Sequence, residues 1–319
     1  MTMTTSVDPK HFLWVEKYRP KTVEETILPK RIKDFFAKFV EKKDIPNLLL
    51  TGSPGVGKTT VARAMCEQLG ISWMFINSSE ERGIDTLRGK IKSYASSASF
   101  VGGRKVIIMD EADYLTPEMQ AALRGVIEEV SSNCTFIFTC NFKGRIIEAL
   151  HSRCQVIDFT IERDERPLVA MQLFKRISSI LDTEGVKWEK EYLFKVVEKY
   201  FPDFRKTLNE LQKLSGNGSI DASILAHLKD LRNLDVLIKA LKEKDFGTMR
   251  KWVTDNSDVD SRVIFRKIYD GLYDYFAGMG IPQAVILLGK YQYQAAFVAD
   301  QEINTAAFLT EIMSECEFK

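Results

Sequence analysis

The sequence predicts an α/β fold built on a parallel, doubly wound sheet, with two smaller helical regions after it. Three observations carry this prediction. Strand-like apolar runs alternate with helical stretches over residues 30–160, those runs are rich in β-branched residues, and apolar residues recur at helical spacing from residue 168 to 214. Because β-branched residues suit strands buried on both faces, a sheet covered by helices is expected. The expected strands are 47–51, 72–77, 105–110, 135–140 and 155–159.

Three domains are expected along the chain. A charged stretch at 162–167 ends the alternating pattern, and Gly-rich residues 215–219 signal a turn or linker. The stretches 234–241 and 284–297 have amphipathic helical patterns, which are typical of a helical packing or oligomerisation domain. The predicted domains are a nucleotide-binding domain at 1–163, a helical domain at 164–227 and a second helical domain at 228–319.

Composition excludes several classes of protein. The 319 residues carry 45 basic and 44 acidic side chains, so no global field attracts the chain to nucleic acid and any DNA contact must be local. The five cysteines form no CxxC pair and the three histidines are scattered, which argues against a zinc module or a disulfide framework. No signal peptide and no membrane-spanning run is found, so we expect a cytoplasmic protein.

A glycine-rich loop between the first expected strand and a helix starting near Lys58 is a complete P-loop. Its glycines let backbone N–H groups turn inward around a phosphate, and the helix N-terminus adds its positive end. Lys58 is expected to reach the β- and γ-phosphates, and the Thr59 hydroxyl to hold Mg²⁺. The chain is therefore expected to bind ATP and Mg²⁺. The nucleotide-binding residues expected here are Gly52, Ser53, Pro54, Gly55, Val56, Gly57, Lys58, Thr59 and Thr60.

Polar residues also end two later strands. Asp110 and Glu111 follow the buried run 105–109, at the edge where open α/β sheets bind ligands. Asp110 is expected to orient Mg²⁺ and Glu111 to polarise the attacking water. Either carboxylate alone could instead cap a helix. Asn141, at the end of the next strand, is expected near the γ-phosphate, although a strand-terminal Asn is also a common turn former.

Arg153 lies in the sequence Ser152-Arg153-Cys154, after a helical turn that carries it toward the domain edge. From there it would not easily reach its own nucleotide, but it could reach a neighbour's. An arginine acting in trans stabilises the charge that develops on a transferred phosphoryl group, which ties hydrolysis to assembly.

Three motifs in order resemble the sliding-clamp loaders of the AAA+ superfamily, the replication factor C type. They are residues 14–20 (Trp-Val-Glu-Lys-Tyr-Arg-Pro), residues 110–113 (Asp-Glu-Ala-Asp) and residues 152–154. Residues 201–207 and 131–134 are further similar to the large subunit of T4-like bacteriophage loaders. The resemblance covers nearly the whole chain. It implies an AAA+ domain, a helical lid and an all-α collar.

The resemblance assigns further nucleotide contacts. It implies that Val15, Tyr18, Arg19 and Pro20 lie by the adenine, where a proline-stiffened aromatic segment can pack against a base. It also implies that Arg205, as the sensor 2 arginine, is carried by the lid to the γ-phosphate. The zinc module of bacterial relatives is missing from this sequence.

The resemblance also implies macromolecular contacts. Ile91, Tyr94 and Ala95 resemble the clamp-binding helix, joined by Phe100, although the same spacing is more often an ordinary core stripe. Arginines on helices that line the inside of the subunit spiral would track a DNA backbone, whereas each alone would be solvated or paired. The expected DNA contacts are Arg82, Arg88, Gln120 and Arg124.

The expected function is that of an ATP-driven clamp-loader subunit. The implied partners are a sliding clamp, primer-template DNA and other loader subunits, in a pentamer of copies of this chain with a small partner subunit. Two alternatives remain open at this point. One is an AAA+ branch-migration helicase, which would usually need a winged DNA-binding domain, and the other is a non-catalytic scaffold subunit, against which intact Lys58 and Glu111 argue.

Overall fold

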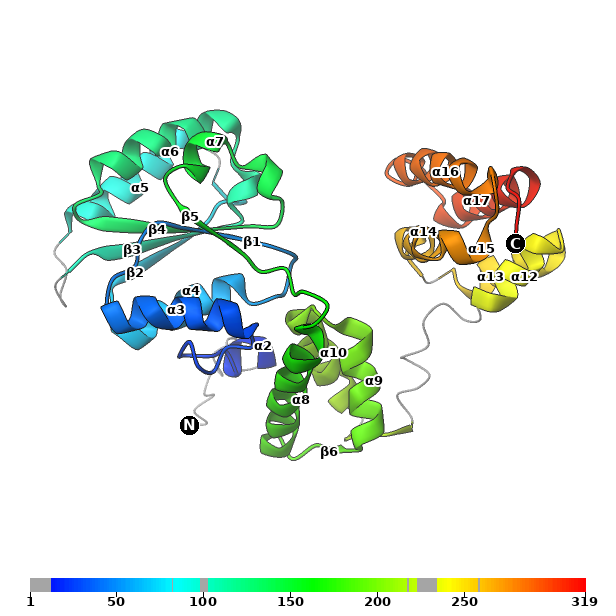
Figure 1. The fold of residues 1–319 in the computed structure, drawn as a ribbon, viewed down its shortest axis with the longest axis horizontal. Coiled ribbons are helices and arrows are strands. Elements are labelled where there is room, and N and C mark those ends of the chain that lie inside the picture. Colours follow the sequence, from blue (N-terminus) through cyan, green and yellow to red (C-terminus); the bar gives the residue numbers. More distant parts are fainter. Residues whose placement is uncertain (1–12, 82, 98–102, 217, 223–233, 258) are drawn as a thin grey trace, which may run out of the picture. The chain divides into compact units, whose positions relative to one another are not determined.

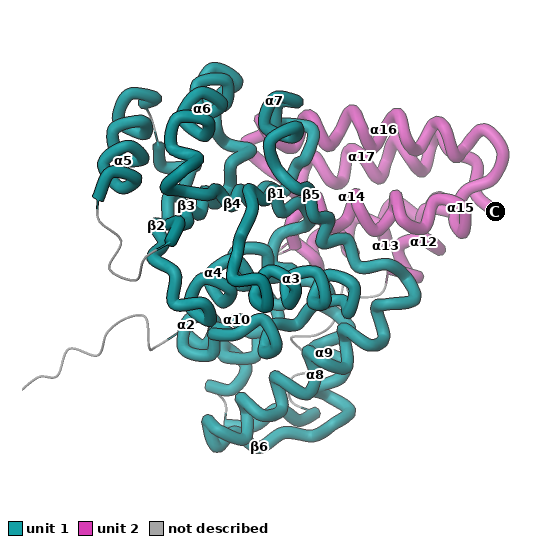
Figure 2. The backbone as a smooth tube through the Cα atoms, turned by 60° about the vertical axis from the view of Figure 1, so that its left-hand side comes forward, with its two compact units in different colours: residues 1–228 teal, residues 229–319 magenta. Residues whose placement is uncertain are grey.

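A computed structural model describes residues 13–81, 83–97, 103–216, 218–222, 234–257 and 259–319. The chain forms two compact units, residues 1–228 and residues 229–319, drawn in teal and magenta (Figure 2). The first unit holds the sheet and the helical lid.

The sheet confirms the predicted fold class. Its five strands are all parallel and run in the order β2-β3-β4-β1-β5. Each starts and ends within one residue of its expected position. They are β1 (Leu48–Thr51), β2 (Trp73–Asn77), β3 (Lys105–Asp110), β4 (Cys134–Cys140) and β5 (Gln155–Asp158).

Helices cover both faces of the sheet (Figure 1). One face packs against α3 (Lys30–Lys42) and α4 (Lys58–Leu69). The other packs against α5 (Ile84–Ser96), α6 (Pro117–Glu129) and α7 (Glu148–His151). Neighbouring residues of β1 show the alternation, since Leu48 and Leu50 join the α3/α4 core and Leu49 joins the other. A sheet buried on both sides requires such continuous apolar strands. Short 3₁₀ turns follow β3 and β4, at η1 (Ala112–Tyr114) and η2 (Lys143–Arg145).

The lid consists of α8 (Arg166–Thr183), α9 (Lys190–Tyr200) and α10 (Phe204–Ser215). It also has a parallel pair of two-residue strands, β6 (Lys187–Trp188) and β7 (Ser219–Ile220), that helical periodicity did not indicate. The glycine-rich signal at 215–219 therefore falls between α10 and β7, inside the lid. The N-terminal helix α2 (Trp14–Lys17) also belongs here, because Trp14 is buried in the lid's apolar core.

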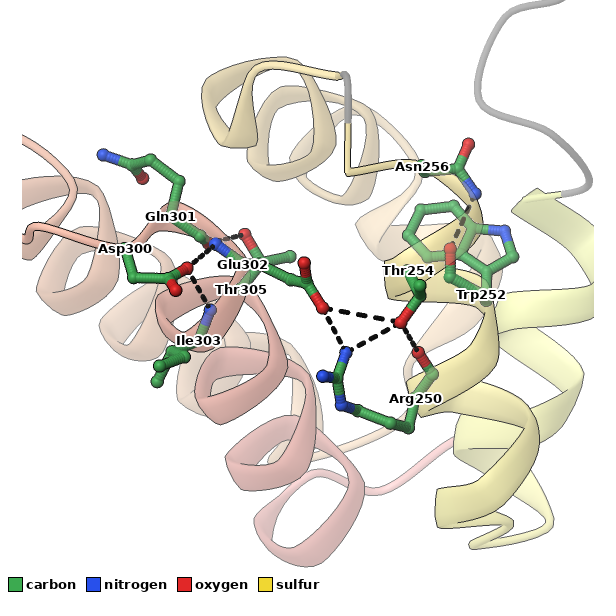
Figure 3. A network of polar contacts seen from close by, with 9 residues as sticks. All are labelled: Arg250, Trp252, Thr254, Asn256, Asp300, Gln301, Glu302, Ile303 and Thr305. Atoms are coloured by element: carbon green, nitrogen blue, oxygen red, sulfur yellow. Dashed lines mark hydrogen bonds and ion pairs between the residues drawn. The ribbon is translucent and has the colours of Figure 1, made fainter.

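The second unit has its own helical core, as the amphipathic patterns predicted. Arg250 on α13 (Phe246–Asp255) and Glu302 on α17 (Gln301–Glu315) form an ion pair at 2.5 Å, and Asp300 caps the start of α17 (Figure 3). The expected helix at 284–297 instead runs from Gly280 to Gln294. The helices are α12 (Leu234–Lys242), α13 (Phe246–Asp255), α14 (Ser261–Asp270), α15 (Leu272–Tyr275), α16 (Gly280–Gln294) and α17 (Gln301–Glu315).

Strand structure is sparse in this unit. Within its described residues the one β contact is an isolated antiparallel bridge between Phe276 and Phe318, so no winged DNA-binding domain is seen there. Throughout the described parts of the chain, every helix is too short or too polar to cross a membrane.

Candidate functional site

The phosphate-binding loop joins β1 to α4. Gly52, Gly55 and Gly57 have φ of 143°, 76° and 95°. Residues with a side chain rarely adopt such values, so glycine is required at these turns. Lys58 begins α4 and its ammonium lies inside the loop, where Nζ donates to the carbonyl oxygens of Gly52 at 2.7 Å and Ser53 at 2.8 Å. The helix N-terminus and this ammonium provide an anion site.

Lys58 also joins the loop to the end of β4. Its Nζ donates to Asn141 Oδ1 at 2.9 Å, so the predicted sensor residue lies against the P-loop lysine. Burial lowers the pKa of the Lys58 ammonium to about 8. A bound phosphate would offset this effect, since an opposite charge favours the charged form of the lysine.

Asp110 collects two hydroxyl groups at the edge of the sheet. The hydroxyls of Thr59 and Thr139 donate to Asp110 Oδ1 at 2.5 and 2.6 Å. A hydroxyl oxygen beside a carboxylate is a donor set that suits Mg²⁺, which is usually held by one or two carboxylates together with substrate phosphates. Among the described residues, no cluster of three or more His, Cys, Asp or Glu forms a complete metal cage. The residues thus fit a magnesium ion that arrives with a nucleotide.

Glu111 sits in an unusual backbone conformation. Its φ of 55° and ψ of 43° are left-handed, and its N–H donates to Thr139 Oγ1 at 3.1 Å. Such conformations cost energy in non-glycine residues and cluster at functional sites. Here the turn brings the Glu111 carboxylate to the wall of the same cleft as Lys58 and Asn141.

Asp113 is the last residue of the Asp-Glu-Ala-Asp motif, and the sequence assigned no role to it. It is buried, and its Oδ2 accepts hydrogen bonds from the backbone N–H groups of Asn141 and Phe142, both at 3.2 Å. Asp113 therefore fixes the end of β4 against the turn that holds Glu111. The signal that could have identified Asp113 in the sequence was its place as the last acidic residue of the Asp-Glu-Ala-Asp motif.

A cleft of about 130 Å³ lies beside the P-loop and is open to solvent. The predicted base-binding residues Val15, Tyr18, Arg19 and Pro20 line it. Arg19 Nη1 also donates to Thr60 Oγ1 on α4 at 3.4 Å. Sequence reasoning missed five further lining residues, which come from the segment after Pro20, from β4 and from α10: Thr26, Ile27, Thr139, Phe204 and Leu208.

The segment that holds the predicted base-binding residues, 14–20, is attached to the lid. Lys17 Nζ and Tyr18 Oη both donate to Glu184, at 2.7 and 2.6 Å, and these bonds hold the pKa of the Glu184 carboxyl below its usual value. Arg176 on α8 donates to the Tyr18 carbonyl at 3.1 Å. The apolar wall of the cleft therefore belongs with the lid, whereas the phosphate loop belongs with the sheet.

Arg205 reaches the cleft from α10. This helix is capped by Asp203, whose Oδ1 accepts from the Lys206 N–H at 2.9 Å, and the Phe204 N–H donates to the Gly55 carbonyl at 3.1 Å. A backbone hydrogen bond thus joins the lid to the phosphate loop next to Arg205. The arrangement brings together Lys58, Thr59, Asp110, Glu111, Asn141 and Arg205 around one cleft.

Substitution of Gly55 by alanine is expected to weaken nucleotide binding about tenfold or more, equivalent to 1.4 kcal/mol. An added Cβ would lie 1.9 Å from Asp203 Oδ1, and the residue's φ of 76° is unfavourable for alanine. The lid must therefore shift away from the loop. Titration with a fluorescent nucleotide measures the effect. Gly70→Ala is the control, because it too has a positive φ but nothing within 4 Å of its Cβ; equal affinity losses in both variants would contradict the clash.

Arg153 lies elsewhere. It does not line the nucleotide cleft and instead lines a separate pocket with Arg104 and Gln155. Its Nε donates to Glu128 Oε1 at 3.0 Å and its Nη1 to the Ala149 carbonyl at 2.9 Å. Arg153 therefore lies away from the nucleotide site of its own chain. The sequence predicted this position for an arginine that acts on a neighbour's nucleotide.

Comparison with known proteins identifies the family. The AAA family model (ATPase family associated with various cellular activities) matches residues 48–161, and the lid-domain model of the sliding-clamp-loader large subunit matches residues 165–226. The sliding-clamp-loader large subunit of Enterobacteria phage T4 is 35% identical over 98% of this chain and 99% of its own length. The chain belongs to the AAA+ clamp-loader family. It is an ATPase with a nucleotide-binding site.

Other similarities agree with this membership. The replication factor C small subunit of Archaeoglobus fulgidus is 41% identical to this clamp-loader chain, over 93% of the chain and 96% of its own length. Among solved structures, the Thermotoga maritima RuvB Holliday junction branch migration motor superimposes with a TM-score of 0.54. It covers 71% of this chain and 80% of RuvB at 17% identity, which shows a shared fold alone.

The predicted clamp-binding helix needs correction in this clamp-loader chain. Ile91 and Ala95 on α5 are buried in the core between the sheet and α6, so the core-stripe interpretation is right and their contact with a clamp is wrong. Tyr94 is half-buried, and Lys105 Nζ lies 4.8 Å from its ring centre. Tyr94 remains a predicted clamp contact. Phe100 lies outside the described residues.

One predicted DNA contact is also wrong. Gln120 is buried on α6, where its Nε2 donates to the Leu115 and Arg145 carbonyls at 3.0 Å and its Oε1 accepts from the Ile147 N–H at 2.9 Å. It holds the loop before α7 and offers no surface to DNA. Its helical spacing from Arg124 did not place both on an exposed face. Arg88 and Arg124 are exposed and remain predicted DNA contacts, and Arg82 lies outside the described residues.

Proposed function

We propose that this chain is the ATP-hydrolysing subunit of a DNA polymerase sliding-clamp loader. In the ATP state it would bind and open a sliding clamp, and on primer-template DNA it would hydrolyse ATP and release the clamp. The observation that carries the proposal is the cleft with two parts. The residues predicted to bind phosphate belong with the sheet, whereas Arg205 and the residues predicted to contact the base belong with the lid. A nucleotide bound across such a cleft contacts the sheet and the lid at once, so the position of the lid depends on the phosphates of the nucleotide.

The chemistry assigned to the cleft follows from its geometry. Lys58 and the loop amides would hold the phosphates, while Thr59 and Asp110 would hold Mg²⁺, which supplies neutralising charge when bound. Glu111 would accept the proton of the attacking water, oriented with help from Asn141. Arg205 would contact the γ-phosphate from the lid.

The proposed partners are a sliding clamp, primer-template DNA and further loader subunits. Full-length relatedness to a phage clamp-loader large subunit supports them. We propose a pentamer of copies of this chain with a small partner subunit, acting in the cytoplasm of a bacterial host. The proposed division is an AAA+ domain at 1–163, a lid at 164–227 and a collar at 228–319.

The test measures ATP hydrolysis by the assembled complex. Addition of both a cognate clamp and primed DNA is expected to raise the rate at least about tenfold, which corresponds to 1.4 kcal/mol of activation free energy. Clamp alone and unprimed single-stranded DNA are the controls and should give less. ATP-driven unwinding of a branched duplex without a clamp would instead establish the helicase alternative, and a complex whose rate is unchanged by Lys58→Ala would establish a scaffold role.

A further inference from the structure

The passage from the sheet to the lid is held by one side chain of α3. β5 ends at Asp158 and α8 begins at Arg166, so residues 159–165 form the linker between the two parts of the first unit. Arg31, in the first turn of α3, lies beside this linker. Its guanidinium contacts the linker at both ends.

Three groups of the guanidinium have separate acceptors. Nη2 donates to the Thr160 carbonyl at 2.6 Å, Nη1 to the Asp158 carbonyl at 3.4 Å, and Nε to Glu165 Oε1 at 2.9 Å. Glu165 immediately precedes α8, and its other oxygen accepts from the Glu162 N–H at 3.1 Å. The rigid planar fork of arginine suits several fixed acceptors at once, which the single ammonium of lysine does not match.

The start of the linker is fixed against the phosphate loop. Phe159 is buried, its N–H donates to the Thr51 carbonyl at 2.8 Å, and its ring lies 6.1 Å from that of Phe36 on α3. A Cβ added to Gly52 would lie 3.0 Å from Phe159 Cβ, so the first glycine of the P-loop packs directly on this residue. Movement of the linker is therefore limited at Phe159 and at Thr160, whose N–H and hydroxyl also donate to Asp158 Oδ1 at 2.8 and 2.7 Å. Arg31 adds the contact to Glu165, at the end of the linker next to the lid.

Fold stability does not explain these contacts well. The Arg31 side chain is 42% exposed, and exposed ion pairs contribute little to the free energy of unfolding. Two of the three acceptors are backbone carbonyls, which define a position along the linker. Since α8, α9 and α10 share one apolar core, an altered linker direction would move α10 with them.

We propose that Arg31 is a positioning residue for lid closure, which fixes the linker so that α10 presents Arg205 to the terminal phosphate of ATP. The proposal rests on the proposed role of Arg205. A lid that samples more orientations is in the binding-competent position for a smaller fraction of time, and the apparent affinity falls by that fraction. The loss should be greater for ATP than for ADP, because only ATP has the phosphate that Arg205 would contact.

The experiment is a double-mutant cycle on nucleotide affinity. Dissociation constants for ADP and for a non-hydrolysable ATP analogue are measured for the unmodified chain, Arg31→Ala, Arg205→Ala and the double variant. Arg31→Ala is expected to raise the dissociation constant of the analogue about fivefold and that of ADP less than about twofold. In the Arg205→Ala background, Arg31→Ala should have almost no further effect on the ratio of the two constants, because both changes remove one interaction.

Further variants separate positioning from charge and folding. Arg31→Lys keeps the charge but not the fork, so most of the loss should persist. Lys30→Ala is the matched control, because its Nζ pairs at 2.7 Å with Asp34 on the same helix. Its affinities should be unchanged, and the melting temperatures of all variants should agree closely.

The outcomes distinguish two failures. Equal weakening of both nucleotides by Arg31→Ala, or effects of Arg31→Ala and Arg205→Ala that simply add, would overturn the role of Arg31 while leaving that of Arg205 intact. An unchanged ratio in Arg205→Ala alone would remove the assigned role of Arg205, and the role of Arg31 with it.

Discussion

Glu111→Gln is expected to lower the rate of ATP hydrolysis about 10²- to 10⁴-fold, the range typical for loss of a general base. ATP affinity should change little, because the amide has nearly the shape of the carboxylate and the phosphate contacts assigned to Lys58 remain. The left-handed turn at Glu111 is held by a hydrogen bond from its own backbone N–H to the Thr139 hydroxyl, which the substitution leaves in place. Single-turnover hydrolysis, with the protein complex in saturating excess over ATP, isolates the chemical step.

The control for this variant is Glu129→Gln, which removes an exposed carboxylate of α6 paired with Lys92 at 2.8 Å. It should hydrolyse ATP at the original rate. If Glu111→Gln lost less than about tenfold in the chemical step, general-base catalysis by Glu111 would be excluded, because that loss is below the range for such a base. A parallel loss of nucleotide affinity would instead point to a structural role for its turn.

The sheet could be predicted from sequence because each strand is an unbroken apolar run. Covering helices bury both faces of a parallel sheet, which leaves a clear contrast between strands and the polar loops around them. The phosphate loop was predictable for a related reason. Its three glycines adopt backbone conformations that few other residues accept, so the positions of the glycines in the sequence identify the loop.

Prediction failed where a decision depended on which face of a helix is covered. Ile91 and Gln120 were expected to contact other molecules, yet α5 and α6 turn both toward the core. Periodicity shows that residues share a face and does not say what lies against it. The two-residue strands β6 and β7 are too short to leave a pattern, and helices α9 and α10 lie between them in the sequence (Lys187 pairs with Ser219).

Long-range contacts at the cleft were equally hidden. Thr26 and Ile27 line the cleft, on a segment that contacts α4 through the Val23 N–H, which donates to Gln68 Oε1 at 2.9 Å. Nothing in the local sequence of these two residues indicates a ligand. The Lys58–Asn141 hydrogen bond joins residues 83 positions apart. The motifs identified Lys58 and Asn141 separately. The parallel pairing of β1 with β4 brings the two residues together.

Arg153→Ala is expected to lower ATP hydrolysis by the assembled complex about 10³-fold or more, as for other arginines that act in trans on a phosphoryl group. Nucleotide binding by the isolated chain should not change, because Arg153 does not line its own cleft. The matched control is Arg163→Ala, which removes an exposed arginine near the start of the lid and should leave the rate unchanged. Steady-state hydrolysis and nucleotide titration together measure both effects.

A mixing experiment decides whether Arg153 acts on a neighbour. Complexes assembled from equal amounts of Arg153→Ala and Lys58→Ala chains contain interfaces where an intact P-loop meets an intact arginine, about a quarter of head-to-tail interfaces under random assembly. Activity should therefore reappear in the mixture, although each variant alone is inactive. An arginine acting within its own chain would leave every site defective and the mixture inactive. The contact that Arg153 would have to give up is its ion pair with Glu128, in which the arginine side chain is 25% exposed and the glutamate 59%. Because solvent screens a partly exposed pair, we expect it to exchange for a phosphate on an approaching subunit at low cost.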